Sequence, residues 1–328
     1  MKKIKILATG GTIAGKAASS TQLTGYTAGA YSVDDLLASV PALGELAQIS
    51  GEQLCNIDSS SITDALLLRL AQRCNELLAQ EDVDGVVITH GTDTMEETAF
   101  FLNLTVKSDK PVVLVGAMRP ATAVSADGPL NIINAVKTAV CAESAGQGVL
   151  VVMNDEIYGG RDVMKTNTAN VATFKAPNGG ALGCIVGGEV RYYYRSVRPH
   201  TLAAEFAISN VTALPRVDII YAHIGQDRVL VDAACAAGAR GLVYAGSGMG
   251  SIHGAVETAL AEAVQSGVVV VRSSRTGSGR VSAGLARWQE QGFLYADNLN
   301  PQKARLLLQL ALLQTHERSE VQELFLHY

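Results

Sequence analysis

Residues 3–15 read KIKILATGGTIAG, and this stretch decides the fold that we expect for the 328-residue chain. A short aliphatic run, 3–8, ends at once in a glycine pair, which is typical of a buried strand followed by a tight turn. Other short apolar runs have the same character, and we expect three more buried strands at 85–89, 111–115 and 148–153.

Longer leucine- and alanine-rich patterns lie between these runs and predict helices at 63–80, 94–106 and 131–145. Apolar strands that alternate with helices are typical of a mostly parallel sheet covered on both faces. Thr94 followed by Glu97 predicts a capping box at the start of the second helix.

The regular alternation breaks down between residues 178 and 215, where glycines and then tyrosines and arginines predict hairpin-like strands followed by a connector. After Pro215 the alternation resumes with strands expected at 217–222, 241–245 and 268–272 and helices at 229–237, 254–265 and 301–315. We therefore expect an N-terminal α/β domain over 1–192, a linker over 193–214 and a smaller C-terminal α/β domain over 215–328.

Composition excludes several classes of protein. Hydrophobic residues make up 48% of the chain, which argues against a disordered protein. The 26 basic and 31 acidic residues give a net charge of −5, so we expect no nucleic-acid partner. No apolar run approaches the roughly 20 residues that a membrane span needs, so we expect no membrane partner either.

The five cysteines are scattered without metal-ligand or redox-motif spacing, and the six histidines show no metal-binding pairing. We read the cysteines as thiols in a reducing compartment, and we expect no metal site. The first residues lack a secretory signal, which favours the cytoplasm, or the periplasm if an upstream signal was removed.

Ligands of open parallel sheets gather beyond the carboxyl ends of the strands, and loops 8–15, 89–94 and 245–251 lie there. In the first loop, Gly10 and Gly15 match the outer glycines of a dinucleotide fingerprint, but Thr12 takes the place of the middle one. The loop could also be a simple tight turn. A third interpretation is that two glycines expose the Thr12 hydroxyl as a nucleophile beside free backbone N–H groups.

Segment 15–29 consists of small residues with Tyr26 as its only aromatic side chain. It is either a surface linker or a lid that closes over Thr12 and brings in the Tyr26 hydroxyl. The second loop places His90, Thr92 and Asp93 at a strand-to-helix junction. Since Thr94 is the expected cap, Thr92 and Asp93 are available for a ligand.

LATGGTIAG around Thr12 and THGTDTMEETA around Thr92 together resemble the bacterial L-asparaginases, closest to the type II enzymes. The resemblance covers essentially the whole chain and continues through 116–131, 153–157, 214–219, 269–279 and 299–305. It implies a two-domain asparaginase-like α/β fold with a larger, mostly parallel, flavodoxin-like N-terminal sheet. It also implies hydrolysis of L-asparagine to L-aspartate and ammonia without a cofactor, in a homotetramer built as a dimer of dimers.

The resemblance also implies roles for individual residues. Thr12 is the expected nucleophile with Tyr26 beside it, and Thr92, Asp93 and Lys165 form a second catalytic cluster. Lys165 could act as a base for Thr92 only if neutral, so burial must oppose the charge of Asp93. The residues expected to contact substrate are Gly11, Ser59, Ser60, Gly91, Ala117, Ser251 from a neighbouring subunit, and Glu290.

Two positions depart from the secreted enzymes. Ser60 replaces a Gln or Glu, as in the cytoplasmic type I branch, and its shorter side chain predicts a weaker grip on the substrate amino group. The segment after Gly279 is not acidic, so Glu290 is the only carboxylate available for the role of the family's cross-subunit Glu, or else it is a surface residue.

Three other functions stay open. A dual glutaminase–asparaginase differs only by one substrate methylene, which is worth about 1–3 kcal/mol. A non-catalytic amino-acid-binding protein on the same scaffold would be expected to lose Thr12, Thr92 or Lys165. An oxidoreductase would use Gly10, Gly15 and Asp34 or Asp35 for a dinucleotide.

Overall fold

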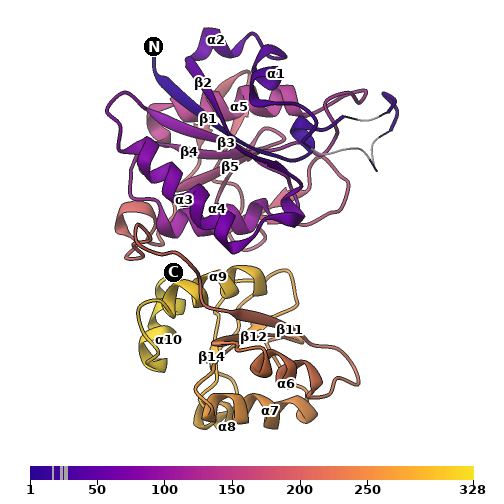
Figure 1. The fold of residues 1–328 in the computed structure, drawn as a ribbon, viewed down its shortest axis with the longest axis vertical. Helices are drawn as coiled ribbons and strands as arrows, with labels where there is room; N and C mark the ends of the chain where they lie inside the picture. Colours follow the sequence, from indigo (N-terminus) through magenta and orange to yellow (C-terminus); the bar gives the residue numbers. More distant parts are fainter. Residues whose placement is uncertain (17, 23–24, 26–28) are drawn as a thin grey trace. The chain divides into compact units, whose positions relative to one another are not determined.

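The computed structural model describes residues 1–328 except 17, 23–24 and 26–28. The chain divides into two compact units, Met1–Asn210 and Val211–Tyr328. The boundary between the units falls inside the predicted linker 193–214. Each unit is an α/β domain, as the alternation of strands and helices predicts (Figure 1).

The first unit is built on an eight-stranded sheet of order β10-β9-β6-β5-β4-β3-β1-β2. Five neighbouring strands are parallel: β2 (Gln48–Ile57), β1 (Lys3–Gly10), β3 (Gly85–Thr89), β4 (Val112–Val115) and β5 (Val149–Met153). Every residue of β3, β4 and β5 is buried, because helices cover both faces of the sheet. The predicted mostly parallel sheet is confirmed.

Three antiparallel strands extend this sheet, namely β6 (Glu156–Gly159), β9 (Gly183–Val186) and β10 (Glu189–Tyr192). Asn154 and Asp155 join β5 to β6 with φ values of 50° and 64°. Positive φ at two successive turn residues matches the twist of an antiparallel pair. β9 and β10 form the predicted hairpin. A separate pair, β7 (Met164–Lys165) and β8 (Phe174–Lys175), has only two residues per strand.

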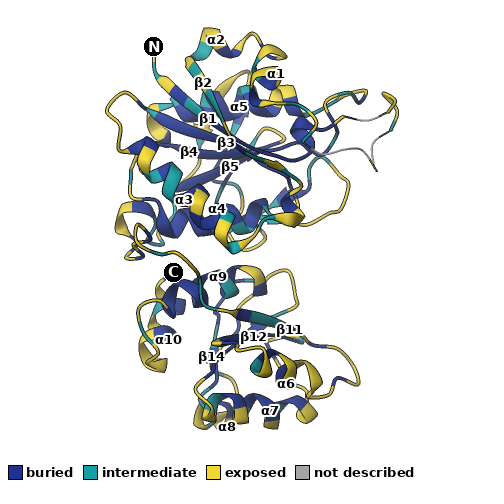
Figure 2. Cartoon of the chain, viewed as in Figure 1, coloured by how far each residue is buried: buried dark blue, intermediate teal, exposed yellow. Residues whose placement is uncertain are grey.

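Helices cover both faces of the eight-stranded sheet (Figures 1 and 2). α1 (Val33–Ala38), α2 (Leu43–Leu46) and α5 (Gly128–Val140) contribute to one continuous apolar core with the sheet. α3 (Asp64–Leu78) and α4 (Met95–Thr105) pack together on the other face. Short 3-10 turns complete the unit: η1 (Thr12–Ala14), η2 (Ser59–Ser61), η3 (Ala142–Ser144) and η4 (Thr201–Ala203).

The second unit has a four-stranded parallel sheet of order β11-β12-β13-β14. Its strands are β11 (Val217–Tyr221), β12 (Gly241–Gly246), β13 (Val269–Ser274) and β14 (Leu294–Tyr295). Its helices are α6 (Val229–Ala236), α7 (Gly254–Gln265), α8 (Ala286–Glu290), α9 (Pro301–Ala311) and α10 (Arg318–His327). The predicted smaller α/β domain is confirmed.

The structure corrects two local predictions. Thr94 lies at the start of α4 but makes no side-chain capping bond, so the predicted capping box is wrong. Its hydroxyl donates instead to the carbonyl oxygen of Ser59, at 2.9 Å. α5 begins at Gly128 rather than 131, since Pro129 fits the first helical turn, and it ends at Val140. Within the described ranges no helix is long and apolar enough to cross a membrane.

Candidate active site

Three segments approach one another closely at the carboxyl edge of the first sheet. Gly11 follows the end of β1 with φ of 80°, and a Cβ atom there would lie 2.4 Å from the Cα of Gly91. A Cβ atom on Gly91, beyond β3, would lie 2.6 Å from the Oγ of Ser59. Only glycine fits at both positions, because either methyl group would drive apart the segments that carry Thr12, Thr92 and Ser59.

A pocket of about 560 Å³ opens beside this contact. Seven of the residues expected from the sequence line it: Gly11, Thr12, Ser59, Gly91, Thr92, Asp93 and Lys165. Strand ends that lie far apart in the sequence thus meet at one edge of the sheet, where ligands of parallel sheets bind.

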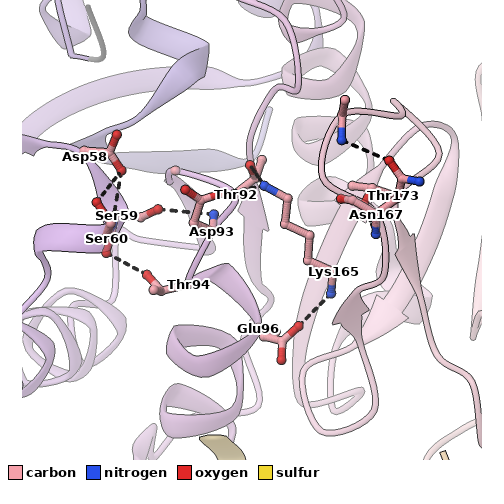
Figure 3. Close-up of polar contacts among 12 residues, drawn as sticks. Asp58, Ser59, Ser60, Thr92, Asp93, Thr94, Glu96, Lys165, Asn167 and Thr173 are labelled. Carbon is pink, nitrogen blue, oxygen red and sulfur yellow. Dashed lines mark hydrogen bonds and ion pairs between the residues drawn. The ribbon is translucent and has the colours of Figure 1, made fainter. Parts of the chain in front are cut away.

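Lys165 links two of the polar side chains in the pocket (Figure 3). Its Nζ lies 2.9 Å from the Oγ1 of Thr92 and 2.5 Å from the Oδ1 of Asp93. The side chain of Lys165 is 15% exposed and that of Asp93 is 59% exposed, so the ion pair faces the pocket opening. The backbone N–H of Asp93 donates to the Oγ of Ser59 at 3.2 Å, which joins this cluster to η2.

Thr12 begins η1 and is buried beside the pocket. The backbone N–H of Gly11 donates to the carbonyl of Ile57 at 3.0 Å, so this particular N–H is not available for an oxyanion. Beyond Thr12, the carbonyl of Gly15 accepts from the N–H of Ala121. Tyr26, the predicted partner of Thr12, lies outside the described residues.

Sequence reasoning missed several residues that line the pocket: Gly25, Asp58, Met118, Arg119, Thr168 and Ala169. One oxygen of Asp58 accepts from both the N–H and the Oγ of Ser60, each at 3.1 Å. The other oxygen has no partner in the part of the chain that the structure describes. Ser60 itself is exposed and turned toward Asp58. The DSS triplet was the signal that could have drawn attention to Asp58.

Asp127 supports the part of the pocket that Met118 and Arg119 line. Its carboxylate accepts the N–H groups of Met118 and Arg119, both at 2.9 Å, and so holds the loop after β4 in place. Ala117, predicted to contact substrate, is completely buried in the core beneath this loop and does not line the pocket.

His90 supports the Thr92 loop from inside the protein and is fully buried. Its Nδ1 lies 2.6 Å from the carbonyl oxygen of Gly91, so Nδ1 carries the proton and Nε2 accepts from the Thr98 hydroxyl at 2.9 Å. Burial lowers the pKa of His90 to about 4, although the contact with Gly91 opposes this shift. The ring is therefore neutral at physiological pH, and it is a structural support rather than a proton donor.

Two predicted residues belong to the second unit. Ser251 pairs with Ser247 in a tight turn, and Glu290 is exposed at the end of α8. The buried guanidinium of Arg272 holds this turn, since it donates to the carbonyls of Gly250 and Ser282 and lies 4.5 Å from the ring centre of Trp288.

Across the described ranges, no group of three or more His, Cys, Asp or Glu could hold a metal ion.

Comparison with known proteins places this fold and pocket in a family. Residues 3–198 match the asparaginase N-terminal domain, and residues 216–325 match the glutaminase/asparaginase C-terminal domain. The chain therefore belongs to the L-asparaginase family and is an amidohydrolase.

Several relatives are similar over the full length. L-asparaginase 2 of Bacillus subtilis is 51% identical over 100% of this chain and 87% of its own length. L-asparaginase 2 of Escherichia coli is 48% identical over 100% of this chain and 94% of its own. A solved structure named a probable cytoplasmic L-asparaginase from Campylobacter jejuni is 50% identical, with a TM-score of 0.98 over 100% of both chains.

The buried His90 predicts a specific dependence of stability on pH. The folded ring stays neutral down to about pH 4, whereas the unfolded chain takes up the proton near pH 6.5. The unfolded state therefore gains protons first, and stability falls as pH decreases between these values. We expect His90 to account for about 3 kcal/mol of this loss.

The measurement is the free energy of unfolding from pH 7 to 4.5 for the natural protein and for His90→Gln, which cannot titrate. Carboxylates contribute to both curves and cancel in the difference. Parallel curves for the two proteins would contradict the prediction.

Proposed function

We propose that this chain hydrolyses L-asparagine to L-aspartate and ammonia with Thr12 as the nucleophile. The observation that carries the proposal is the 2.9 Å contact between Lys165 Nζ and Thr92 Oγ1 in a pocket that Thr12 also lines. An aliphatic hydroxyl attacks an amide only if another group takes its proton. The names of the B. subtilis and E. coli relatives agree with this substrate.

The reaction takes two steps. The Thr12 oxygen adds to the side-chain amide carbon, and its proton passes through a base to the amide nitrogen. The C–N bond then breaks, and the nitrogen leaves as ammonia. A water molecule then cleaves the Thr12 ester, which releases L-aspartate and restores the hydroxyl. Tyr26 is the proposed proton acceptor for Thr12, directly or through water. Lys165, whose Nζ lies 2.9 Å from the Oγ1 of Thr92, is the proposed proton-transfer partner of Thr92.

We assign the binding of the substrate's charged groups to the same pocket. Ser59 and Asp93 contact the α-carboxylate and the α-ammonium group, as the family resemblance implies. Asp58 adds a second carboxylate, and its oxygen that has no partner among the described residues can accept from the ammonium. This carboxylate compensates in part for the short reach of the Ser60 side chain.

A dual glutaminase–asparaginase is the second candidate. The pocket of about 560 Å³ leaves room for a substrate with one more methylene. A relative from Pseudomonas fluorescens, 44% identical over 100% of this chain and 91% of its own length, is named a glutaminase-asparaginase. One methylene changes the transition-state energy by only about 1–3 kcal/mol, so both substrates are within reach of this site.

We further propose a homotetramer, a dimer of dimers in which Ser251 and Glu290 reach the site of a neighbouring subunit. Both residues lie at exposed positions of the second unit, where another chain can meet them. We assign the protein to the cytoplasm because all five cysteines are free thiols. The names of its relatives include both a cytoplasmic and a periplasmic enzyme.

The proposed function is tested by ammonia release from L-asparagine and from L-glutamine at matched concentrations and neutral pH. Release from asparagine alone supports a selective asparaginase. Comparable release from both supports the dual activity. No release from either amide would overturn the proposal.

Thr12→Ala should abolish turnover while the fold is retained. We expect kcat to fall by at least about 10³-fold, as when a nucleophile is removed. The melting temperature should change little, since Thr12 begins the short turn η1 beside the pocket rather than lying in a strand of the sheet. Thr12→Ser keeps the hydroxyl and is the matched control. Full turnover by Thr12→Ala would disprove the nucleophile role.

Ser60→Gln should strengthen substrate binding. A longer side chain can add a hydrogen bond to the charged ammonium, and we expect KM for L-asparagine to fall by about tenfold with kcat unchanged. Ser61→Gln is the control. Neither serine lines the pocket, but the Ser60 hydroxyl contacts the carboxylate of the pocket residue Asp58, whereas Ser61 donates its backbone N–H to the Asp58 carbonyl. An unchanged KM in Ser60→Gln, or an equal decrease in Ser61→Gln, would contradict this prediction.

A further inference from the structure

α4 is buried on almost every side, although it carries polar residues. Ten of its residues are buried: Met95, Glu96, and all residues from Thr98 to Thr105. A polar group inside a protein is costly unless it has a hydrogen-bond partner. The partners of these buried side chains therefore show which parts of the structure depend on the helix.

Glu96 has a partner in the candidate active site (Figure 3). Its Oε2 accepts from the backbone N–H of Lys165 at 2.6 Å, across 69 residues of sequence. Because Glu96 is buried, its carboxyl oxygen needs a hydrogen-bond partner inside the protein, and the Lys165 amide supplies one.

The backbone of Lys165 has little support from its own strand. It lies in β7, a strand of two residues that forms a two-stranded sheet with the equally short β8. An isolated pair of strands is marginal at best, and this one is much shorter than a typical hairpin. The contact with Glu96 connects the Lys165 backbone to a helix in the core.

Residues at the start of α4 also contact the other segments that line the pocket. Thr94 donates to the carbonyl of Ser59, and Thr98 donates to His90, which in turn contacts Gly91 beside Thr92. The first residues of one buried helix thus connect to three segments of the pocket.

From this arrangement we propose that Glu96 is a positioning residue for the reaction, which sets the place of the Lys165 amine relative to Thr92 and Asp93. The proposal rests on the function proposed above and extends it. Glu96 acts through the Lys165 backbone and the rigidity of α4, and its oxygen is required as a hydrogen-bond acceptor rather than as a charge.

A purely structural role would give a different result, and the same helix supplies a control. Asn103 is also buried on α4, and its Oδ1 accepts from the backbone N–H of Val149 at 3.0 Å. Like the contact of Glu96, it joins a side-chain oxygen of α4 to a backbone N–H, but it holds β5, and neither Asn103 nor Val149 lines the pocket. Asn103→Ala therefore removes a similar support from the core without affecting Lys165.

The experiment compares Glu96→Gln, Glu96→Asp, Glu96→Ala and Asn103→Ala with the natural protein, using kcat and KM for L-asparagine. Glu96→Gln keeps an oxygen at the same distance, so we expect kcat within about threefold of the natural value. Glu96→Asp keeps the charge but withdraws the oxygen by one methylene. A displacement of about 1 Å can cost about 100-fold in rate, so we expect kcat to fall by about 10- to 100-fold, with KM little changed.

Glu96→Ala should lose at least as much kcat, and Asn103→Ala should lose stability but not kcat. If Glu96→Ala does not fold, the proposal is still tested by whether Glu96→Gln has a higher kcat than Glu96→Asp. A more active Asp variant would show that charge matters rather than the acceptor, and would overturn the proposal. An equal loss of kcat in Asn103→Ala would also overturn it.

Hydrogen exchange on peptides covering Lys165 gives a readout that does not need turnover. We expect the Lys165 amide to lose protection in the Asp and Ala variants and to keep it in Glu96→Gln and Asn103→Ala. Lost protection with an unchanged kcat would overturn the proposal while leaving the proposed function intact. If the natural protein shows no turnover, both the proposed function and the positioning role are overturned. The exchange data would then still show whether the Lys165 amide donates to Glu96.

Discussion

The candidate site depends on a close approach of three chain segments that leaves no room for a side chain. Gly11 faces Gly91 and Gly91 faces Ser59, at distances that a single methyl group would not fit. β1 lies between β2 and β3 in the parallel sheet, so all three segments emerge at the same edge. Because these segments touch, Thr12, Thr92 and Ser59 share one pocket.

The second constraint is the burial of α4. Each buried polar group without a partner costs about 1–3 kcal/mol, so the side chains of Glu96 and Thr98 must find partners inside the protein. Their partners are the backbone of Lys165 and the ring of His90. The stability of the core and the geometry of the pocket are therefore linked through one helix, and His90 adds a pH-dependent element because its buried ring resists protonation.

Much of the architecture could be predicted from sequence because short apolar strands and amphipathic helices have distinct periods. The edge strand β2 was not predicted, since most of its residues are only half-buried or exposed and carry no continuous apolar run. The cap at Thr94 was wrong for a different reason. Its hydroxyl could satisfy either the helix end or a distant carbonyl, and only the packing of η2 against α4 decides between them.

Some residues of the candidate site could likewise be predicted from the sequence, and others could not. Thr12, Thr92 and Asp93 follow predicted strands, so the rule for parallel sheets already placed them at one edge. Lys165 lies 73 positions from Thr92 on a two-residue strand, and only the resemblance to a family pointed to it. Glu96 had no local signal that set it apart from an ordinary acid in the first turn of a helix.

The sequence by itself determined the class of fold, the order of its elements and the two threonine loops, because these depend on local periodicity and turn chemistry. The tertiary structure alone decided that the Lys165 amide donates to Glu96 and that the Thr94 hydroxyl donates to the Ser59 carbonyl. Both contacts join elements distant in sequence. Burial decides which polar groups come together to form them, and no local pattern encodes that.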